Sequence, residues 1–143
     1  MIPYSRQYVN NKDISAVIKV LKSDFLTKGP VVKKFEKTIC KNFSSKFAVS
    51  SNSGSSSLQL ACLALGLEKN DLVWTVPVTY AASANCAINC GAKVDFVDIC
   101  PDTFNLSIDK LKQKLAIAKK IKKLPKIIIP VHLAGLPYEQ KKL

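Results

Sequence analysis

Residues 72–99 read LVWTVPVTYAASANCAINCGAKVDFVDI. Two short apolar runs, Leu72 to Val76 and Val94 to Ile99, lie on either side of an alanine-rich stretch. That stretch, Thr79 to Cys90, is long enough for a helix, and Gly91 is well placed to end it. Two apolar runs joined by a helix predict a crossover unit in which the two strands pair in parallel.

The same alternation continues on both sides of this unit. We expect two more strands, at residues 46–50 and 127–131, which makes four parallel strands in all. The run of three isoleucines that begins at Ile127 is typical of a strand buried on both faces. Further helices are expected over residues 13–21, from Pro30 to Phe43 with one buried face, from the serine-rich turn to near Gly66, over residues 107–123, and beginning at Tyr138. The predicted fold class is α/β, with a mainly parallel sheet and helices on both faces.

Composition narrows the class of protein. Hydrophobic residues make up 48% of the 143, but no apolar run approaches the roughly 18 residues of a membrane span. The first six residues lack the layout of a secretory signal, so we expect a cytoplasmic protein without membrane contact. The five cysteines are scattered and His132 is the sole histidine, which favours reduced thiols and no metal site.

The formal net charge is +12, and 21 of the 22 basic residues are lysines. Eight of these lysines lie between Lys110 and Lys126, where a helix is expected. A basic helix can hold nucleic-acid phosphates, but base recognition favours arginine, and no aromatic residues interleave with this run. We therefore expect a solvated helix face that does not bind nucleic acid, although its charge can attract an anionic substrate.

Two motifs at predicted strand ends are candidates for a binding site. The segment 52–58 (NSGSSSL) joins a strand to a helix N-terminus, where free N–H groups and hydroxyls favour an anion. It is neither a Walker A loop nor a G-x-G-x-x-G turn, and its spacing leaves open a phosphate site or a simple helix cap. Tyr80 follows the next strand and can either pack or offer its ring to a flat heterocycle. We expect the turn and the ring to face one concavity.

Two further positions could bear chemistry but are given structural interpretations. His132 follows the fourth predicted strand, and because no partner is identifiable nearby, a hydrogen-bonded structural role is favoured. Asp95 and Asp98 occupy nearby positions of one predicted strand, which does not establish a carboxylate pair for acid–base catalysis.

Five stretches, in order and over nearly the whole chain, resemble the sugar aminotransferases of the DegT/DnrJ type. These belong to the aspartate-aminotransferase fold of pyridoxal-phosphate enzymes. The stretches are residues 24–30 (DFLTKGP), 52–56 (NSGSS), 77–85 (PVTYAASAN), 91–99 (GAKVDFVDI) and 130–135 (PVHLAG). The resemblance implies an incomplete large domain without the small C-terminal domain. Residues 1–30 would form an N-terminal arm and substrate loop, and residues 31–143 the alternating α/β part.

The resemblance also implies roles for particular residues. Ser55 and Ser56 match a pair that holds the phosphate of pyridoxal 5'-phosphate, and Tyr80 matches the aromatic residue that stacks on the pyridine ring. Other positions match residues that line the sugar-nucleotide site; they are Tyr4, Asp24, Phe25, Leu26, Thr27 and Ser53. The implied activity moves an amino group from glutamate to the 4-keto carbon of a UDP-linked deoxysugar, of the pseudaminic acid type, in a homodimer.

The family's lysine that binds the cofactor covalently, and the aspartate that pairs with the pyridine nitrogen, belong to motifs absent from residues 1–143. No catalytic residue is therefore assigned, and we expect an N-terminal portion that is inactive and poorly stable alone. Two alternatives stay open. The chain could be a free-standing nucleotide- or phosphate-binding α/β module, or a non-catalytic partner of a complete transaminase.

Overall fold

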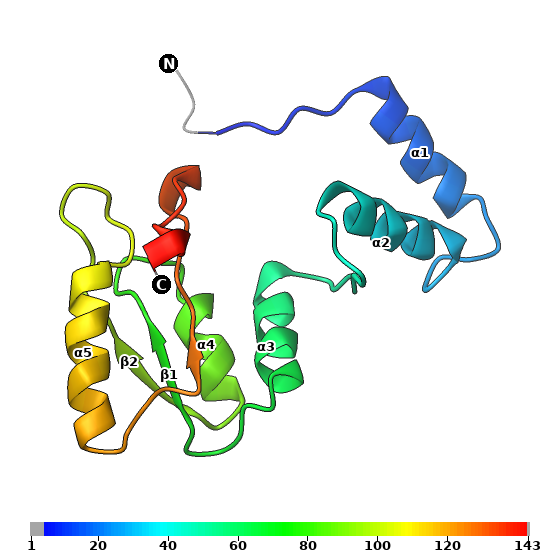
Figure 1. The fold of residues 1–143 in the computed structure, drawn as a ribbon. Coiled ribbons are helices and arrows are strands. Elements are labelled where there is room, and N and C mark those ends of the chain that lie inside the picture. The colour runs from blue at the N-terminus through cyan, green and yellow to red at the C-terminus, as the bar shows by residue number, and fades with distance from the viewer. Residues whose placement is uncertain (1–4, 143) are drawn as a thin grey trace. The chain divides into compact units, whose positions relative to one another are not determined.

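The computed structural model describes residues 5–142, which form parts of two compact units, residues 1–50 and residues 51–143 (Figure 1). In the first unit, helix α1 spans Asn11–Leu21 and helix α2 spans Pro30–Asn42. Asn10 caps α1, since its side chain accepts a hydrogen bond from the Lys12 N–H while the Asp13 carboxylate accepts one from the Asn10 N–H. Pro30 lies in the first turn of α2, as expected.

Two expectations for this first unit are wrong. Neither helix contains a buried residue, and Phe35, on the apolar stripe of α2, is 55% exposed. Residues 46–50 are not a strand, and Phe47 is 77% exposed. The physical reason is the same in both cases, because the described part of this unit offers neither a sheet nor a further element to cover an apolar stripe or pair with a strand. The segment is instead tied at Ser50, whose N–H and hydroxyl both donate to the Glu36 carboxylate, at 2.9 and 3.0 Å.

The second unit has the expected alternation of helices and strands (Figure 1). The helices are α3 (Gly54–Ala64), α4 (Ala82–Asn89) and α5 (Ile108–Lys120), and the strands are β1 (Leu72–Thr75), β2 (Lys93–Phe96) and β3 (Ile127–Ile128). Two 3-10 turns follow, Leu133–Gly135 and Gln140–Lys142, so the helix expected to begin at Tyr138 is described only as a short turn. The strands pair in parallel in the order β2-β1-β3, which confirms three of the four predicted strands.

Strand β1 is central, and its alternating side chains reach the two faces of the sheet. Val73 packs in one cluster with Cys62 of α3 and with Cys86 and Ala87 of α4. Trp74 packs in the other cluster; its buried partners include Leu106, Ile108, Leu111 and Ala118, most of them on α5. Helices therefore cover both faces, as predicted, with α3 and α4 on one side and α5 on the other (Figure 1).

Prolines and glycines set several element boundaries. The ladder between β1 and β3 ends just before Pro130, which has no N–H to donate, and β3 is therefore shorter than the expected 127–131. Gly91 follows α4 with a φ of 78°, a conformation that strains other residues, and its N–H donates to the carbonyl of Ile88. No helix among residues 5–142 is long and apolar enough to cross a membrane.

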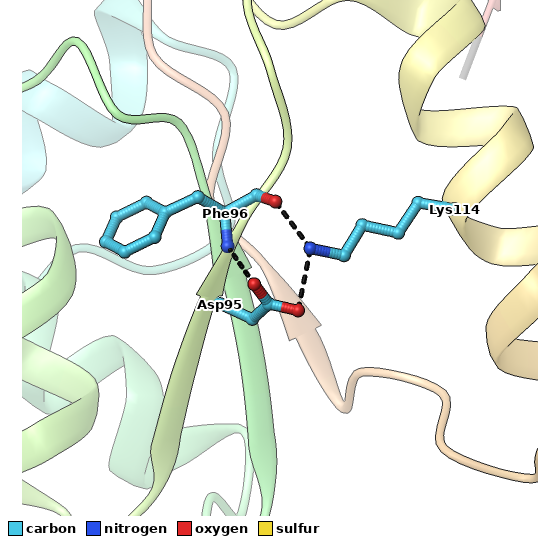
Figure 2. A network of polar contacts seen from close by, with 3 residues as sticks. All are labelled: Asp95, Phe96 and Lys114. Atoms are coloured by element: carbon cyan, nitrogen blue, oxygen red, sulfur yellow. Dashed lines mark hydrogen bonds and ion pairs between the residues drawn. The ribbon is translucent and has the colours of Figure 1, made fainter.

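A polar network connects α5 to the edge strand β2 (Figure 2). The Lys114 ammonium lies 2.7 Å from the Asp95 carboxylate and also donates to the Phe96 carbonyl, while the Phe96 N–H donates to Asp95. Partial burial would raise the pKa of Asp95, but the hydrogen bonds from Lys114 and Phe96 outweigh it and lower that pKa. The same ammonium lies 4.8 Å from the centre of the Trp74 ring, a cation–π distance. Asp95 is therefore occupied by a structural contact.

Candidate functional site

Helix α3 begins in the serine-rich turn, and serine side chains build its N-terminal cap. The Ser53 side chain accepts a hydrogen bond from the Ser56 N–H at 3.2 Å and lies 3.0 Å from the Ser56 hydroxyl. The Ser51 and Ser57 hydroxyls are 2.6 Å apart, which closes the turn from the other side. Among residues 5–142, neither the N–H nor the hydroxyl of Ser55 has a hydrogen-bond partner. The helix cap is thus formed, and Ser55 keeps its donors available.

A cavity of about 380 Å³ lies between the first turns of α3 and one face of α4. Ser55, Ser56 and Gln59 line it from α3, and Tyr80 lines it from the loop before α4. The remaining lining residues are Ala81, Ala82, Asn85, Cys86 and Asn89. The expectation that the serine turn and Tyr80 share a concavity is confirmed for Ser55 and Ser56, whereas Ser57 does not line it. Tyr80 is 80% exposed, so its ring is available for contact.

Among residues 5–142, none of those that line the cavity carries a charged side chain. An anion bound there would be stabilised by the positive end of the α3 dipole and by the free Ser55 donors. The amides of Gln59, Asn85 and Asn89 add neutral donors and acceptors. The start of α4 is held by a hydrogen bond between the Thr79 and Ser83 hydroxyls, 2.8 Å apart. The arrangement suits a ligand that combines a phosphate with a flat apolar part.

Sequence reasoning missed the three amide side chains of this wall. Asn85 and Asn89 are one helical turn apart on α4, and Gln59 is one turn from Ser55 and Ser56 on α3. Helical periodicity counted from the serine pair therefore indicates Gln59. The choice of the face of α4 that meets α3 required the tertiary structure.

The other predicted site residues are placed differently. Ser53 is the N-cap of α3, with its side chain bonded inside the turn, and it does not line the cavity. Asp24, Phe25, Leu26 and Thr27 form an exposed loop between α1 and α2 in the first unit, where the Phe25 N–H donates to the Ser23 hydroxyl. Tyr4 lies outside the described residues. Their role in binding a sugar nucleotide stays a prediction.

His132 is hydrogen-bonded, as expected, and the structural role favoured for it stays a prediction. Its Nδ1 accepts a hydrogen bond from the Tyr138 N–H at 3.3 Å, and the two rings stack with their centres 5.1 Å apart. Asp98 accepts a hydrogen bond from the Ile99 N–H. Within the described part of the chain, no group of three or more histidine, cysteine or acidic residues is arranged to hold a metal ion.

Comparison with known proteins identifies the family. Residues 7–143 match the model of the DegT/DnrJ/EryC1/StrS aminotransferase family. The chain belongs to this family. Family membership confirms the resemblance drawn from the five sequence stretches, and the description of the family names aminotransferases.

Individual relatives agree with this assignment. The chain is 44% identical over 115 residues to a UDP-4-amino-4,6-dideoxy-N-acetyl-beta-L-altrosamine transaminase of Campylobacter jejuni, a match covering 80% of this chain and 30% of that protein. It is 36% identical to a UDP-4-amino-4-deoxy-L-arabinose–oxoglutarate aminotransferase of Shewanella sediminis, covering 94% of this chain and 33% of that protein. A putative sugar aminotransferase of Streptococcus pneumoniae in its PMP form superposes with a TM-score of 0.87 at 31% identity, covering 99% and 34% of the two chains. The chain thus spans about a third of the length of these relatives.

Proposed function

We propose that this chain forms the phosphate and ring-face part of the pyridoxal-phosphate site of a nucleotide-sugar aminotransferase. Ser55 and Ser56 hold the cofactor phosphate at the start of α3, and Tyr80 stacks on the pyridine ring. The proposal rests on the shared cavity. Its wall brings together the serine pair and the ring of Tyr80, which is 24 residues from Ser56 and 25 from Ser55 in the sequence.

The cavity fits such a cofactor in size and chemistry. Its volume of about 380 Å³ falls within the roughly 300–1,000 Å³ that is usual for small-molecule sites. The unpartnered Ser55 N–H and hydroxyl at a helix N-terminus suit a phosphate dianion, and the exposed Tyr80 ring suits a flat heterocycle. Solved relatives in PLP and PMP forms share this fold at TM-scores of 0.86 and 0.87.

Pyridoxal phosphate, when bound, supplies the electron sink for transamination. The residues of this chain anchor and orient it. The α3 amides and serine hydroxyls fix the phosphate, and Tyr80 covers one face of the ring and excludes water there. Within residues 5–142, neither a lysine nor a carboxylate lines the cavity. On this proposal the covalent lysine and the aspartate for the pyridine nitrogen come from sequence other than these 143 residues, and the chain alone completes neither half of a transamination.

The finer proposal concerns the substrates. The names of the Campylobacter and Shewanella relatives support a UDP-linked 4-keto sugar as amino acceptor, and the Shewanella name includes oxoglutarate, the product of glutamate as donor. We assign the product to the pseudaminic acid type because of the 44% identity to the Campylobacter transaminase. Asp24 to Thr27, with Tyr4 and Ser53, are proposed to contact the sugar nucleotide. The complete enzyme is proposed to act as a cytoplasmic homodimer.

The cofactor assignment is tested by equilibrium binding of pyridoxal phosphate to the 143-residue chain and its variants. Ser55→Ala removes a hydrogen bond to a charged phosphate, worth about 1.5–3 kcal/mol, so we expect Kd to rise about 10–100-fold. Tyr80→Ala removes a stacked ring, worth about 0.5–1.5 kcal/mol, so Kd should rise about 2–10-fold, while Tyr80→Phe keeps the affinity. The measurement is equilibrium dialysis, checked by the quenching of Trp74 fluorescence, since none of these variants changes Trp74.

Matched controls come from the first unit. Ser45→Ala and Tyr8→Ala remove an exposed serine and an exposed tyrosine that do not line the cavity, and both should leave Kd unchanged. Pyridoxal without phosphate should lose its dependence on Ser55 and keep its dependence on Tyr80. Binding of inorganic phosphate or UDP as tight as that of pyridoxal phosphate, with no effect of Tyr80→Ala, would contradict the proposal. That result would favour the free-standing phosphate-binding module.

A further inference from the structure

Two cysteines meet beneath the cavity. Cys62 of α3 and Cys86 of α4 are each 2% exposed, and their sulfur atoms lie 3.8 Å apart. Sulfur atoms at this distance are in van der Waals contact, and both side chains belong to the cluster that packs α3 and α4 against β1. The Cys86 thiol also lies 3.4 Å from the Ser83 carbonyl, as a hydrogen-bond donor. The structure contains both as free thiols.

The two thiols differ in their access to small molecules. Cys86 lines the cavity, whereas Cys62 is not part of its wall. Burial raises the pKa of the Cys62 thiol to about 11, so this group stays protonated at neutral pH and is a poor nucleophile. An oxidant that enters the cavity therefore meets Cys86 first, with Cys62 as the neighbouring thiol that completes a disulfide.

We propose that Cys62 and Cys86 form a redox-sensitive thiol pair whose oxidation to a disulfide clamps α3 to α4 behind the cavity. In this step two S–H bonds break and one S–S bond forms. The two protons and two electrons pass to an oxidant of the azo or peroxide class. Diamide becomes its hydrazine form, and hydrogen peroxide becomes two molecules of water.

The clamp acts on the candidate site through the helices. The sulfur atoms must move from 3.8 Å to about 2.05 Å apart, so the oxidised form draws α3 and α4 together. Ser55 and Ser56 lie on α3, and Asn85 and Asn89 lie on α4, which places the moving elements on opposite walls of the cavity. Oxidation should therefore narrow the cavity and restrict local opening of both helices.

The test is diamide oxidation of the native chain without any ligand, followed by thiol titration in denaturant and non-reducing peptide mapping. We expect the number of titratable thiols to fall from five to three and the map to contain a Cys62–Cys86 cross-linked peptide. Amide hydrogen exchange of α3 and α4 should slow on oxidation and recover with dithiothreitol. Because no cofactor is present, failure here is distinguishable from failure of the pyridoxal-phosphate assignment.

Matched variants separate this pair from the other cysteines. Cys62→Ala and Cys86→Ala should each abolish the loss of two thiols. Cys90→Ala removes a half-buried thiol whose pKa is raised by burial and by the neighbouring Cys62, and it should leave the loss intact, as should Cys40→Ala in the first unit. If either alanine variant fails to fold, the peptide map of the unaltered chain still shows whether Cys62 and Cys86 are cross-linked. A cross-link between any other pair, or five thiols after treatment, would overturn the proposal, as would unchanged exchange in the cross-linked chain.

Discussion

The two units of this chain differ in where their apolar helix residues lie, since helices α1 and α2 bury none of theirs, whereas the helices of the second unit bury theirs against a sheet. Helices α1 and α2 of the first unit have apolar stripes with no buried residue, and Phe35 remains more than half exposed. Helices α3, α4 and α5 of the second unit pack against a parallel sheet and bury two clusters around Val73 and Trp74. An amphipathic pattern therefore specifies a helix and its apolar face, but burial requires a complementary surface. The poor stability expected for the isolated chain stays a prediction.

The largest expected effect is on stability, and it compares a buried position in the second unit with an exposed position in the first. Trp74→Ala empties a buried site between β1 and α5 and should lower the free energy of unfolding by about 3–5 kcal/mol. Phe35→Ala, at an exposed position of α2, should change it by less than about 0.5 kcal/mol. Urea denaturation followed by circular dichroism measures both, and hydrogen exchange of β1 amides measures the first if the transition is broad. Equal losses for the two variants would show that the first unit is also packed in solution.

A smaller loss of stability is expected when a helix cap is removed, and the two units should differ in it. Ser53→Ala removes the cap of α3 and should cost about 1 kcal/mol, seen as a lower urea midpoint of the second unit. Asn10→Ala removes the capping box of α1 and should increase amide exchange in that helix without moving this midpoint, because α1 buries nothing. Ser45→Ala, at an exposed position outside any helix, serves as the control. A shift of the midpoint by Asn10→Ala would mean that the two units unfold together.

The smallest effect is that of the network in Figure 2, and it depends on pH. The contact with Lys114 lowers the pKa of Asp95 below its value of 3.8 in unfolded chains, so its stabilisation is present above pH 3.8 and is lost as the pH falls through the folded-state value. Because both groups are partly exposed, Lys114→Ala should cost only about 0.5–1 kcal/mol at neutral pH.

Acid titration of the urea midpoint checks the sign of this effect. Asp95→Asn should flatten the pH dependence between about pH 5 and pH 2. If the urea midpoint of Asp95→Asn falls with acid pH as it does in the unaltered chain, the contact between Asp95 and Lys114 does not contribute to stability.

Part of the fold followed from local signals. Apolar runs, prolines and glycines placed three strands and five helices near their observed positions, with Pro30 at the start of α2 and Gly91 just after α4. The extended segment 46–50 was wrongly predicted as a strand, because its residues have strand propensity but no ladder partner among the described residues. Strand propensity is a property of a segment, whereas pairing is a property of two segments.

The features of the candidate site also fall into those that local sequence predicts and those that depend on tertiary packing. The sequence alone determined that the serine turn begins a helix, that Tyr80 follows a strand, and that the chain resembles its family, because these depend on neighbouring residues and ordered motifs. Only the tertiary structure decided that Ser55, Tyr80 and Asn85 line one cavity and that the thiols of Cys62 and Cys86 touch beneath it. The physical reason is that helical periodicity defines which side chains share a face, while the packing of α3 against α4 on the sheet selects which faces meet.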